Sequence, residues 1–267
     1  MMTLRKMKTN HTTSGMVEYE FLQKSAEESI LTPLNDKLGQ KIKLNYAEKI
    51  WCVACGKKST KSFNQGHCFR CFQTLPECDS CIMSPEKCHF EQGSCRNSEW
   101  GNTHCNIPHT VYLANSSGVK VGITRQNQQK TRWMDQGAIQ AIELGRVSTR
   151  FLSGQVECAF KNFVTDRTSW QKMLKGGNES LDMLAERARL IGEWPTTIPM
   201  IETSEAIVHE FSYPVIEYPL KVKSLDLEKT PEIEGTLMGI KGQYLLLDVG
   251  VINIRKFSGY EVEMKLG

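Results

Sequence analysis

The sequence predicts an α+β protein with a cysteine-rich module, a small α/β unit and a strand-rich C-terminal part. Three observations indicate this class. The chain has 267 residues, more than one hydrophobic core usually holds. Nine of its ten cysteines lie between Cys52 and Cys105. Apolar residues alternate as in strands both before and after that region. We therefore divide the chain into residues 1–51, 52–105, 106–175 and 176–267.

The composition is that of a soluble globular chain. Hydrophobic residues make up 40% and charged residues 24%, and the mean hydropathy is −0.38. No apolar run approaches the ~20 residues that span a bilayer, so we expect no membrane contact. The basic residues 1–10 are not followed by the apolar stretch of a signal peptide. These features predict a cytoplasmic protein.

Residues 1–51 predict a small β element that leads into the cysteine-rich module. Alternation in residues 41–46 places Ile42, Leu44 and Tyr46 on one face, as in a half-buried strand. We expect this element to have a structural role.

The first four cysteines have the spacing of a zinc-ribbon-like site. Two residues separate Cys52 from Cys55 and Cys68 from Cys71, with twelve residues between the pairs. Such a pair can place both thiolates on a tetrahedral ion at ~2.3 Å within one tight turn. Gly56 permits the bend that aims amide hydrogens at a sulfur. Because four protein ligands fill the coordination sphere, we predict a structural Zn²⁺.

The later cysteines predict a second zinc ion with less regular ligand spacing. We expect Cys78 and Cys81 as ligands, with two of Cys88, Cys95 and Cys105. In the alternative, some of these are buried free thiols, and His89 and His104 are ordinary surface residues. Disulfides are the other alternative, but no export signal supports them. A segment with so few aliphatic side chains needs metal, and a structural zinc supplies roughly 10 kcal/mol or more.

Charge is concentrated in the third segment. Residues 106–175 contain ten Lys and Arg against four Asp and Glu, whereas residues 176–267 contain nine against fifteen. If any part of the chain binds phosphate, the basic segment is the place to expect it. The alternative is that these charges are solvated faces.

A hairpin and a helix are predicted within this basic segment. Residues 110–114 and 119–124 form strands around a turn at 115–118. Ser153 can cap a helix whose apolar stripe contains Val156, Phe160, Phe163 and Val164.

These elements carry a phenol, several cations and one carboxylate. Tyr112 and Lys120 lie on the hairpin, and Glu157 lies on the flank of the helix one turn before Lys161. Together such groups can orient a water, bind a phosphodiester and hold one Mg²⁺. The alternatives are a half-buried strand tyrosine, surface cations and a helix-surface ion pair worth ~0.3 kcal/mol.

The same stretch resembles the GIY-YIG endonucleases over about residues 110–175. Thr110-Val111-Tyr112 stands for the first tripeptide of that family and Lys120-Val121-Gly122 for the second, so Lys120 replaces the second tyrosine. The resemblance implies phosphodiester hydrolysis by a small α/β unit. It also implies that Tyr112 assists the attacking water, Arg132 neutralises the scissile phosphate and Glu157 holds a single Mg²⁺ or Mn²⁺.

The chain as a whole is similar to a bacterial family defined as domain of unknown function 2797. The resemblance rests on residues 52–105, 110–125, 132–138 and 239–244. It brings no established activity.

Residues 176–267 predict a helix followed by strands. Asn178 can cap a helix that presents Leu181, Leu184, Ala185 and Ala188 on one face before Gly192 ends it. Residues 219–227, 234–240, 244–249 and 251–254 are predicted strands. This acidic tail forms a small barrel or sheet, which the strands before Cys52 can complete.

Two functions of different classes fit these observations. In the first, the chain is a metal-dependent nuclease that cuts DNA or RNA and uses Tyr112, Lys120, Arg132 and Glu157. In the second, an inactive nuclease-like scaffold binds nucleic acid or a ribonucleoprotein through Lys120, Arg125, Lys130 and Arg132. A third hypothesis is a zinc-stabilised module whose acidic tail recognises a basic protein.

Overall fold

The computed structural model describes residues 2–165, 167–177, 179–201 and 205–267. The chain forms two compact units. Unit 1 contains residues 1–73, 174–176 and 212–267, and unit 2 contains residues 74–173 and 177–211. The first and last segments of the sequence therefore share one unit, and the cysteine-rich segment is divided after Gln73.

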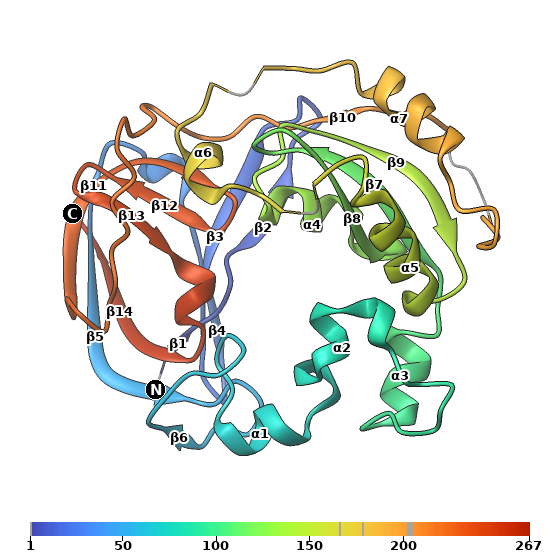
Figure 1. The fold of residues 1–267 in the computed structure, drawn as a ribbon. Helices are drawn as coiled ribbons and strands as arrows, with labels where there is room; N and C mark the ends of the chain where they lie inside the picture. The colour runs from blue at the N-terminus through green and yellow to red at the C-terminus, as the bar shows by residue number, and fades with distance from the viewer. Residues whose placement is uncertain (1, 166, 178, 202–204) are drawn as a thin grey trace. The chain divides into compact units, whose positions relative to one another are not determined.

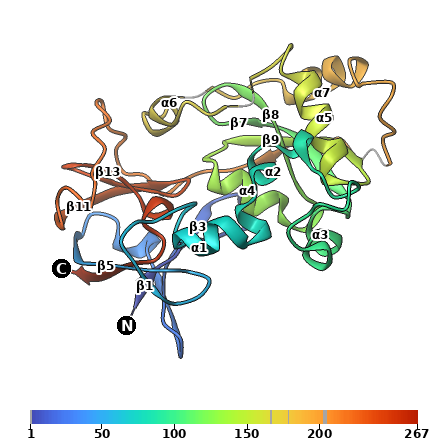
Figure 2. The same cartoon turned by 60° about the horizontal axis from the view of Figure 1, so that its bottom comes forward.

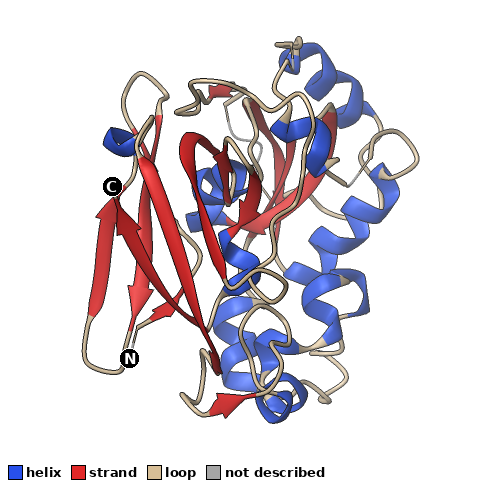
Figure 3. Cartoon of the chain, turned by 90° about the vertical axis from the view of Figure 1, so that its left-hand side faces the viewer, coloured by secondary structure: helices blue, strands red, loops and turns tan. Residues whose placement is uncertain are grey.

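Unit 1 is built on a curled, half-barrel sheet of ten strands (Figure 1). At its centre β5 (Lys41–Trp51) pairs antiparallel with β11 (Glu232–Lys241) and β14 (Tyr260–Leu266), and the long strands lie next to the C terminus in Figure 3. Strands preceding Cys52 thus complete the C-terminal sheet, as expected. The other strands are β1 (Thr3–Leu4), β2 (Lys8–His11), β3 (Val17–Lys24), β4 (Ser29–Pro33), β6 (Lys58–Ser59), β12 (Tyr244–Leu247) and β13 (Gly250–Asn253).

Alternation in β5 orients its side chains as predicted. Ile42 and Leu44 are fully buried, and Leu44 lies opposite Ile233 of β11. Gln243, in the turn between β11 and β12, accepts a hydrogen bond from the Met7 amide at 2.8 Å and donates one to the Met7 carbonyl at 3.1 Å. This side chain therefore satisfies the backbone of a distant segment and joins the two ends of the chain within unit 1.

One predicted strand of the tail is wrong. Residues 219–227 form only an isolated bridge, between Ser224 and Val251, and Leu220 is 89% exposed. The predicted strands at 234–240, 244–249 and 251–254 correspond to β11, β12 and β13. A short 3₁₀ helix, η5 (Ile254–Phe257), then leads to β14, a strand that was not among the predicted ones although its apolar and charged residues alternate.

Unit 2 contains a four-stranded antiparallel sheet with the order β10-β9-β7-β8. The predicted hairpin is present as β7 (His109–Asn115) and β8 (Val119–Arg125), with Tyr112 opposite Gly122. Gly118 in the connecting turn has a φ of +122°, which a residue with a side chain rarely adopts. On its other edge β7 pairs with β9 (Gln140–Val147), which is followed in the sheet by β10 (His209–Glu210).

Helices cover both faces of this sheet. On one face α5 (Arg150–Phe160) and α7 (Met183–Gly192) bury the apolar side chains of the strands (Figure 2). On the other face α4 (Gln129–Asp135) places Trp133 against Tyr112, with ring centroids 5.8 Å apart. The apolar core includes Val111, Leu113, Val121, Ile142, Leu144, Val156, Phe160, Met183 and Leu190.

Both helices of that core begin at residues other than the predicted ones, and α5 buries Val156 and Phe160 of its predicted apolar stripe. Thr149, not Ser153, caps α5, because its hydroxyl accepts a hydrogen bond from the Leu152 amide at 3.2 Å. Asp182 caps α7, whereas the predicted cap Asn178 lies outside the described residues. The apolar face of α7 is also different, since Leu181 and Leu184 are exposed while Met183 and Leu190 are buried.

The remaining helices are short. They are α1 (Phe69–Thr74) in unit 1, α2 (Ser80–Met83) and α3 (Ser98–His104) in unit 2, and α6 (Trp170–Leu174). Within the described part of the chain, no helix is long and apolar enough to cross a membrane.

Candidate metal centre and phosphate site

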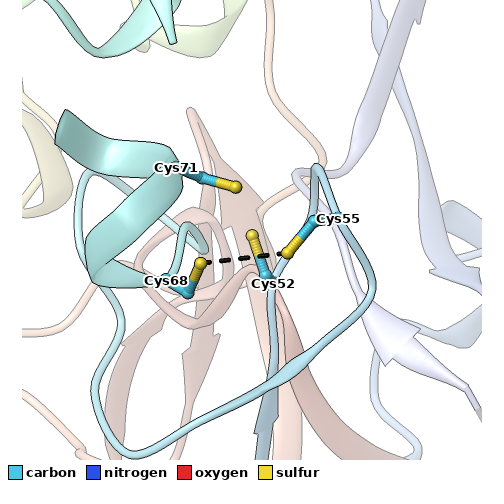
Figure 4. A group of neighbouring side chains, drawn as sticks. All are labelled: Cys52, Cys55, Cys68 and Cys71. Atoms are coloured by element: carbon cyan, nitrogen blue, oxygen red, sulfur yellow. Dashed lines mark hydrogen bonds between the residues drawn. The ribbon is translucent and has the colours of Figure 1, made fainter. Parts of the chain in front are cut away.

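Cys52, Cys55, Cys68 and Cys71 form a compact cluster in unit 1. Their ligand atoms all lie within 4.8 Å of one another, and the sulfurs point toward a common centre (Figure 4). The sulfur atoms of Cys55 and Cys68 are 3.8 Å apart. Four convergent thiols match the donor set and the tetrahedral arrangement that structural zinc prefers.

The local backbone explains why these sulfurs meet. Cys52 follows β5, and the chain turns back so that the Gly56 amide donates to the Cys52 carbonyl at 2.9 Å. Gly56 has a φ of +70° in this turn. The second pair lies at the start of α1, with Cys68 just before the helix and Cys71 inside it. The module therefore places one cysteine pair in a turn and the other at a helix.

Backbone amides prepare Cys52 for metal binding. Burial acts to raise the pKa of Cys52, but hydrogen bonds from the backbone of Cys55, Cys68 and Ala54 outweigh it and lower the pKa to about 6. The thiolate is the form that binds metal, so these donors favour the ligating state. Because four cysteines would fill a tetrahedral shell, a zinc ion bound here would have no open position for a substrate, and the cluster is compatible with a structural zinc.

The later cysteines belong to unit 2. Cys78, Cys81 and Cys105 are buried, and Cys88 and Cys95 are half-buried. Near them, ligand atoms of Asp79, Cys81 and His89 lie within 4.8 Å of one another.

Tyr112, on strand β7 of the predicted hairpin, is fully buried. The side chain extends across the sheet over Gly122, where an added Cβ would lie 2.6 Å from the phenol oxygen. The phenol donates a hydrogen bond to Gln136 Oε1 at 3.2 Å. A side chain at position 122 would therefore clash with the Tyr112 ring, which packs over β8 at this point, so the glycine is required by this contact and not by turn geometry.

Arg132 and Glu157 both act on the Tyr112 phenol. Burial raises the pKa of Tyr112, Arg132 opposes this shift through its charge and a hydrogen bond, and the charge of Glu157 adds to it. Arg132 belongs to α4 and Glu157 to α5, and both side chains are half-buried. The phenol, guanidinium and carboxylate that the sequence singled out thus lie within electrostatic range of one another, although they come from three elements.

The other predicted cations occupy different environments. Lys120 is only 5% exposed. Lys130 is exposed on α4, and Arg125 is half-buried and donates to Gln128 Oε1 at 2.9 Å. The structure therefore leaves Arg125, Lys130 and Arg132 at or near the surface and buries Lys120.

Two residues of this region were missed by sequence reasoning. The first is Arg150, whose pKa is lowered by burial and raised by the charges of Cys105 and Cys81. The charge of Arg132 also lowers this pKa, and the charge of Glu157 raises it. Burial likewise lowers the pKa of His109 to about 4, and the charges of Arg150 and Arg125 oppose its protonation. Within the described residues, His109 Nε2 has no hydrogen-bond partner. The sequence offered one signal for Arg150. It follows Thr149, a residue type that caps helices, and so could be expected at the start of a helix.

Replacing Gly122 with alanine is expected to destabilise unit 2 by about 1–3 kcal/mol, because the buried Tyr112 ring has no space to move away. The free energy of urea unfolding measures the effect. Gly192→Ala is the control, since its Cβ would meet nothing within 4 Å. Equal unfolding free energies for the two variants would show that the close approach is unimportant.

Comparisons with known proteins assign the chain to a family. A search of the curated proteins and a search of the solved structures each found no match. The family model described as "Protein of unknown function (DUF2797)" matches residues 39–262, most of the chain. The match includes the four-cysteine cluster, the hairpin and both candidate site helices. The chain therefore belongs to the DUF2797 family.

Proposed function

We propose that the protein binds nucleic acid through unit 2 and hydrolyses a phosphodiester there with one divalent ion. The observation that carries this proposal is the electrostatic proximity of Arg132 and Glu157 to Tyr112 and to Arg150. A cation for phosphate and a carboxylate for a metal ion are the minimum set for metal-assisted hydrolysis. The resemblance to GIY-YIG endonucleases agrees with this reaction class.

The environment of each residue suggests its role. Arg132, half-buried at the surface of α4, binds the scissile phosphate and neutralises its charge. Tyr112 is fully buried, so it does not touch substrate; it lies within electrostatic range of Arg132 and helps to position that side chain beneath the surface. Arg150 adds a second positive charge beside Glu157.

Glu157 provides the ligand for the divalent ion. Its carboxylate is half-buried and offers the oxygen donors that Mg²⁺ and Mn²⁺ prefer, with water and substrate phosphate supplying the other ligands. A divalent ion bound at Glu157 would supply Lewis-acid polarisation of the phosphate. In the family resemblance the same residue holds the metal.

Incubation of the purified chain with supercoiled DNA, and separately with structured RNA, tests this function. Nicked or shortened products are expected with Mg²⁺ or Mn²⁺ and not in their absence, as resolved on a gel. Binding of both substrates with no product under either ion would contradict the hydrolytic function.

That second result would favour binding without cleavage, and one observation supports this alternative. Tyr112 and Lys120, two of the four residues expected to act in catalysis, are buried away from solvent. An inactive nuclease-like unit that binds nucleic acid or a ribonucleoprotein would still need Arg125, Lys130 and Arg132.

Nucleic-acid binding by unit 2 is expected to weaken steeply with salt. The logarithm of the association constant should fall linearly with the logarithm of salt concentration, because each contacted phosphate releases counterions. Alanine at Arg125, Lys130 or Arg132 should in each case make this negative slope shallower by about 1. Fluorescence anisotropy across a salt series measures this slope. Lys265→Ala, an exposed lysine of β14 in unit 1, is the control and should leave the slope unchanged.

A further inference from the structure

We propose that Asp79, Cys81 and His89 of unit 2 bind a second zinc ion. The ligand atoms of these three side chains all lie within 4.8 Å of one another. Asp79 and Cys81 are buried, with 9% and 8% of their surface exposed, and His89 is half-buried. A carboxylate, a thiolate and an imidazole are the three kinds of ligand that proteins offer to zinc, and here one of each meets at one place.

The separation of Asp79 from His89 suits two ligands on one ion. His89 Nε2 lies 3.5 Å from Asp79 Oδ2. This distance is longer than the roughly 2.7–3.2 Å of an ordinary hydrogen bond between nitrogen and oxygen. Two ligands bonded to zinc at about 2.0–2.1 Å in a tetrahedral shell lie about 3.3–3.4 Å apart. The observed distance is therefore closer to the edge of a zinc tetrahedron than to a direct hydrogen bond.

Ser94 orients the imidazole of His89 for metal binding. The Ser94 hydroxyl donates a hydrogen bond to the His89 carbonyl at 3.4 Å. Its oxygen lies 2.9 Å from His89 Nδ1 and accepts the proton of that nitrogen. With the proton on Nδ1, Nε2 carries a lone pair and faces the Asp79 carboxylate. Two electron-rich atoms in this position repel one another, and a cation bound by both removes the repulsion.

Arg96 holds the Asp79 carboxylate in place from outside the cluster. Arg96 Nε donates to Asp79 Oδ2 at 2.9 Å, and Arg96 Nη1 donates to the Leu75 carbonyl at 3.0 Å. Carboxylates that bind metals are commonly hydrogen-bonded by a second layer of residues. Because each carboxylate oxygen has two lone pairs, Asp79 can accept from Arg96 and bind a metal ion at the same time.

The cluster also lines a small cavity with other cysteines of the segment. The predicted ligands in this lining, besides Cys81, are Cys88, Cys95 and Cys105. Three protein ligands leave a fourth position in a tetrahedral shell, which water or one of these thiols can fill. Among the residues that the structure describes, Cys78 belongs neither to the cluster nor to this lining, although it is buried.

The local structure explains what a zinc ion would stabilise here. Residues 80–105 contain only the four-residue α2, the 3₁₀ helix η3 (Pro85–Lys87) and the seven-residue α3. Helices this short are unstable alone. Asp79 precedes α2, Cys81 lies within it and His89 lies two residues after η3. An ion bound by all three would join α2 to the chain that follows η3.

The same segment supports the start of α5. The Ile82 carbonyl, next to Cys81, accepts a hydrogen bond from Arg150 Nη2 at 2.6 Å. The Cys105 carbonyl accepts one from the Arg150 amide at 2.8 Å. An added Cβ at Gly154 would lie 2.5 Å from the Glu86 amide nitrogen, so α5 packs closely on η3. A zinc ion that fixes α2 therefore helps to position Arg150. The site itself does not rest on the proposed function.

The zinc content of the full chain, purified without chelator, tests this site. Two zinc ions per chain are expected, one of them at the four-cysteine cluster. Cys81→Ser and His89→Ala should each lose one ion. Cys158→Ser, on α5, and His104→Ala, at the end of α3, are the matched controls and should keep both. A single zinc ion in the unaltered chain, or two in His89→Ala, would overturn the proposal.

A variant outside the ligand set tests the orientation of the histidine. Ser94→Ala should weaken binding of the second zinc ion by about 10–100-fold, because it removes the outer hydrogen bond to Nδ1 of His89. Zinc transfer to a chromophoric chelator measures this affinity. Ser84→Ala is the control, since Ser84 lies in the same segment and its side chain makes no capping hydrogen bond. Equal zinc affinities in the two variants would overturn Nε2 of His89 as a ligand.

If the ligand variants do not fold, X-ray absorption by zinc in the unaltered chain still decides the question. Sulfur neighbours at about 2.3 Å are expected together with nitrogen and oxygen neighbours at about 2.0–2.1 Å, which His89 and Asp79 supply. All-sulfur ligation would overturn the proposal. These measurements use no nucleic acid, and a chain that never cleaves it gives the same metal readout. Failure of the proposed function is therefore distinguishable from failure of this inference.

Discussion

Replacing Cys68 with serine should remove one zinc ion per chain and unfold residues 52–73. A structural zinc contributes roughly 10 kcal/mol or more, which is comparable to the ~5–15 kcal/mol that stabilises a whole domain. The apolar contacts that would remain are few. Phe63 stacks on Phe72 and packs at a tilt against Phe69, with centroids 5.6 and 5.4 Å apart, but Phe69 is 54% exposed. Zinc content by elemental analysis and limited proteolysis measure the two effects.

The expected proteolytic cuts fall between β5 and α1, while the sheet of unit 1 stays protected. Its strands pair through β5, β11 and β14 and do not depend on the cysteines. Cys158→Ser is the matched control and should keep both the zinc and the protease resistance of the unaltered chain. If Cys68→Ser kept the full zinc content, the cluster would not be a metal site.

The cysteine cluster was predictable because its constraint is local. Two residues between Cys52 and Cys55 restrict the turn between them, and the glycine that permits this turn follows directly in the sequence. The hairpin was predictable for the same reason, since its register follows from a short turn at Gly118 and the alternation of the flanking residues.

Features that depend on distant partners were not predictable in the same way. Residues 219–227 alternate like a strand but have no neighbouring strand along their length, so they form a single bridge at Ser224. The apolar stripe of α7 was misplaced because Leu184 is exposed in the fold, whereas Met183 packs on β9 and its neighbours. Local periodicity reports which face can be buried and not which partner buries it.

The candidate phosphate site was predictable only in part, because it depends both on local sequence and on distant partners. The sequence indicated Tyr112, Arg132 and Glu157 by their type and order, but the burial of Tyr112 depends on Trp133 and Gly122, which come from other elements. In the proposed function, Tyr112 therefore positions Arg132 in place of contacting the attacking water. Arg150 was missed because its importance arises from the packing of residues 80–105 on α5.

Replacing Glu157 with glutamine is expected to lower the rate of phosphodiester cleavage on the order of 10²-fold or more. The variant keeps the shape of the side chain and removes the negative charge that holds a divalent ion, and metal assistance is worth several kcal/mol of barrier. Nucleic-acid affinity should stay the same or rise, because a negative charge is removed from beside Arg132 and Arg150. Single-turnover cleavage of labelled substrate, measured with an anisotropy titration, separates the two effects.

Glu186→Gln is the matched control for this experiment. Glu186 lies on α7 of the same unit and forms a surface ion pair with Arg189 at 2.8 Å, which is worth little to stability. Cleavage should persist in this variant and be lost in Glu157→Ala as in Glu157→Gln. Because Arg150 interacts electrostatically with both Glu157 and Arg132, removing the Glu157 carboxylate makes the site more positive, which favours phosphate over a divalent cation. Cleavage that continued in Glu157→Gln would show that the metal ligand lies elsewhere and that these charges serve binding alone.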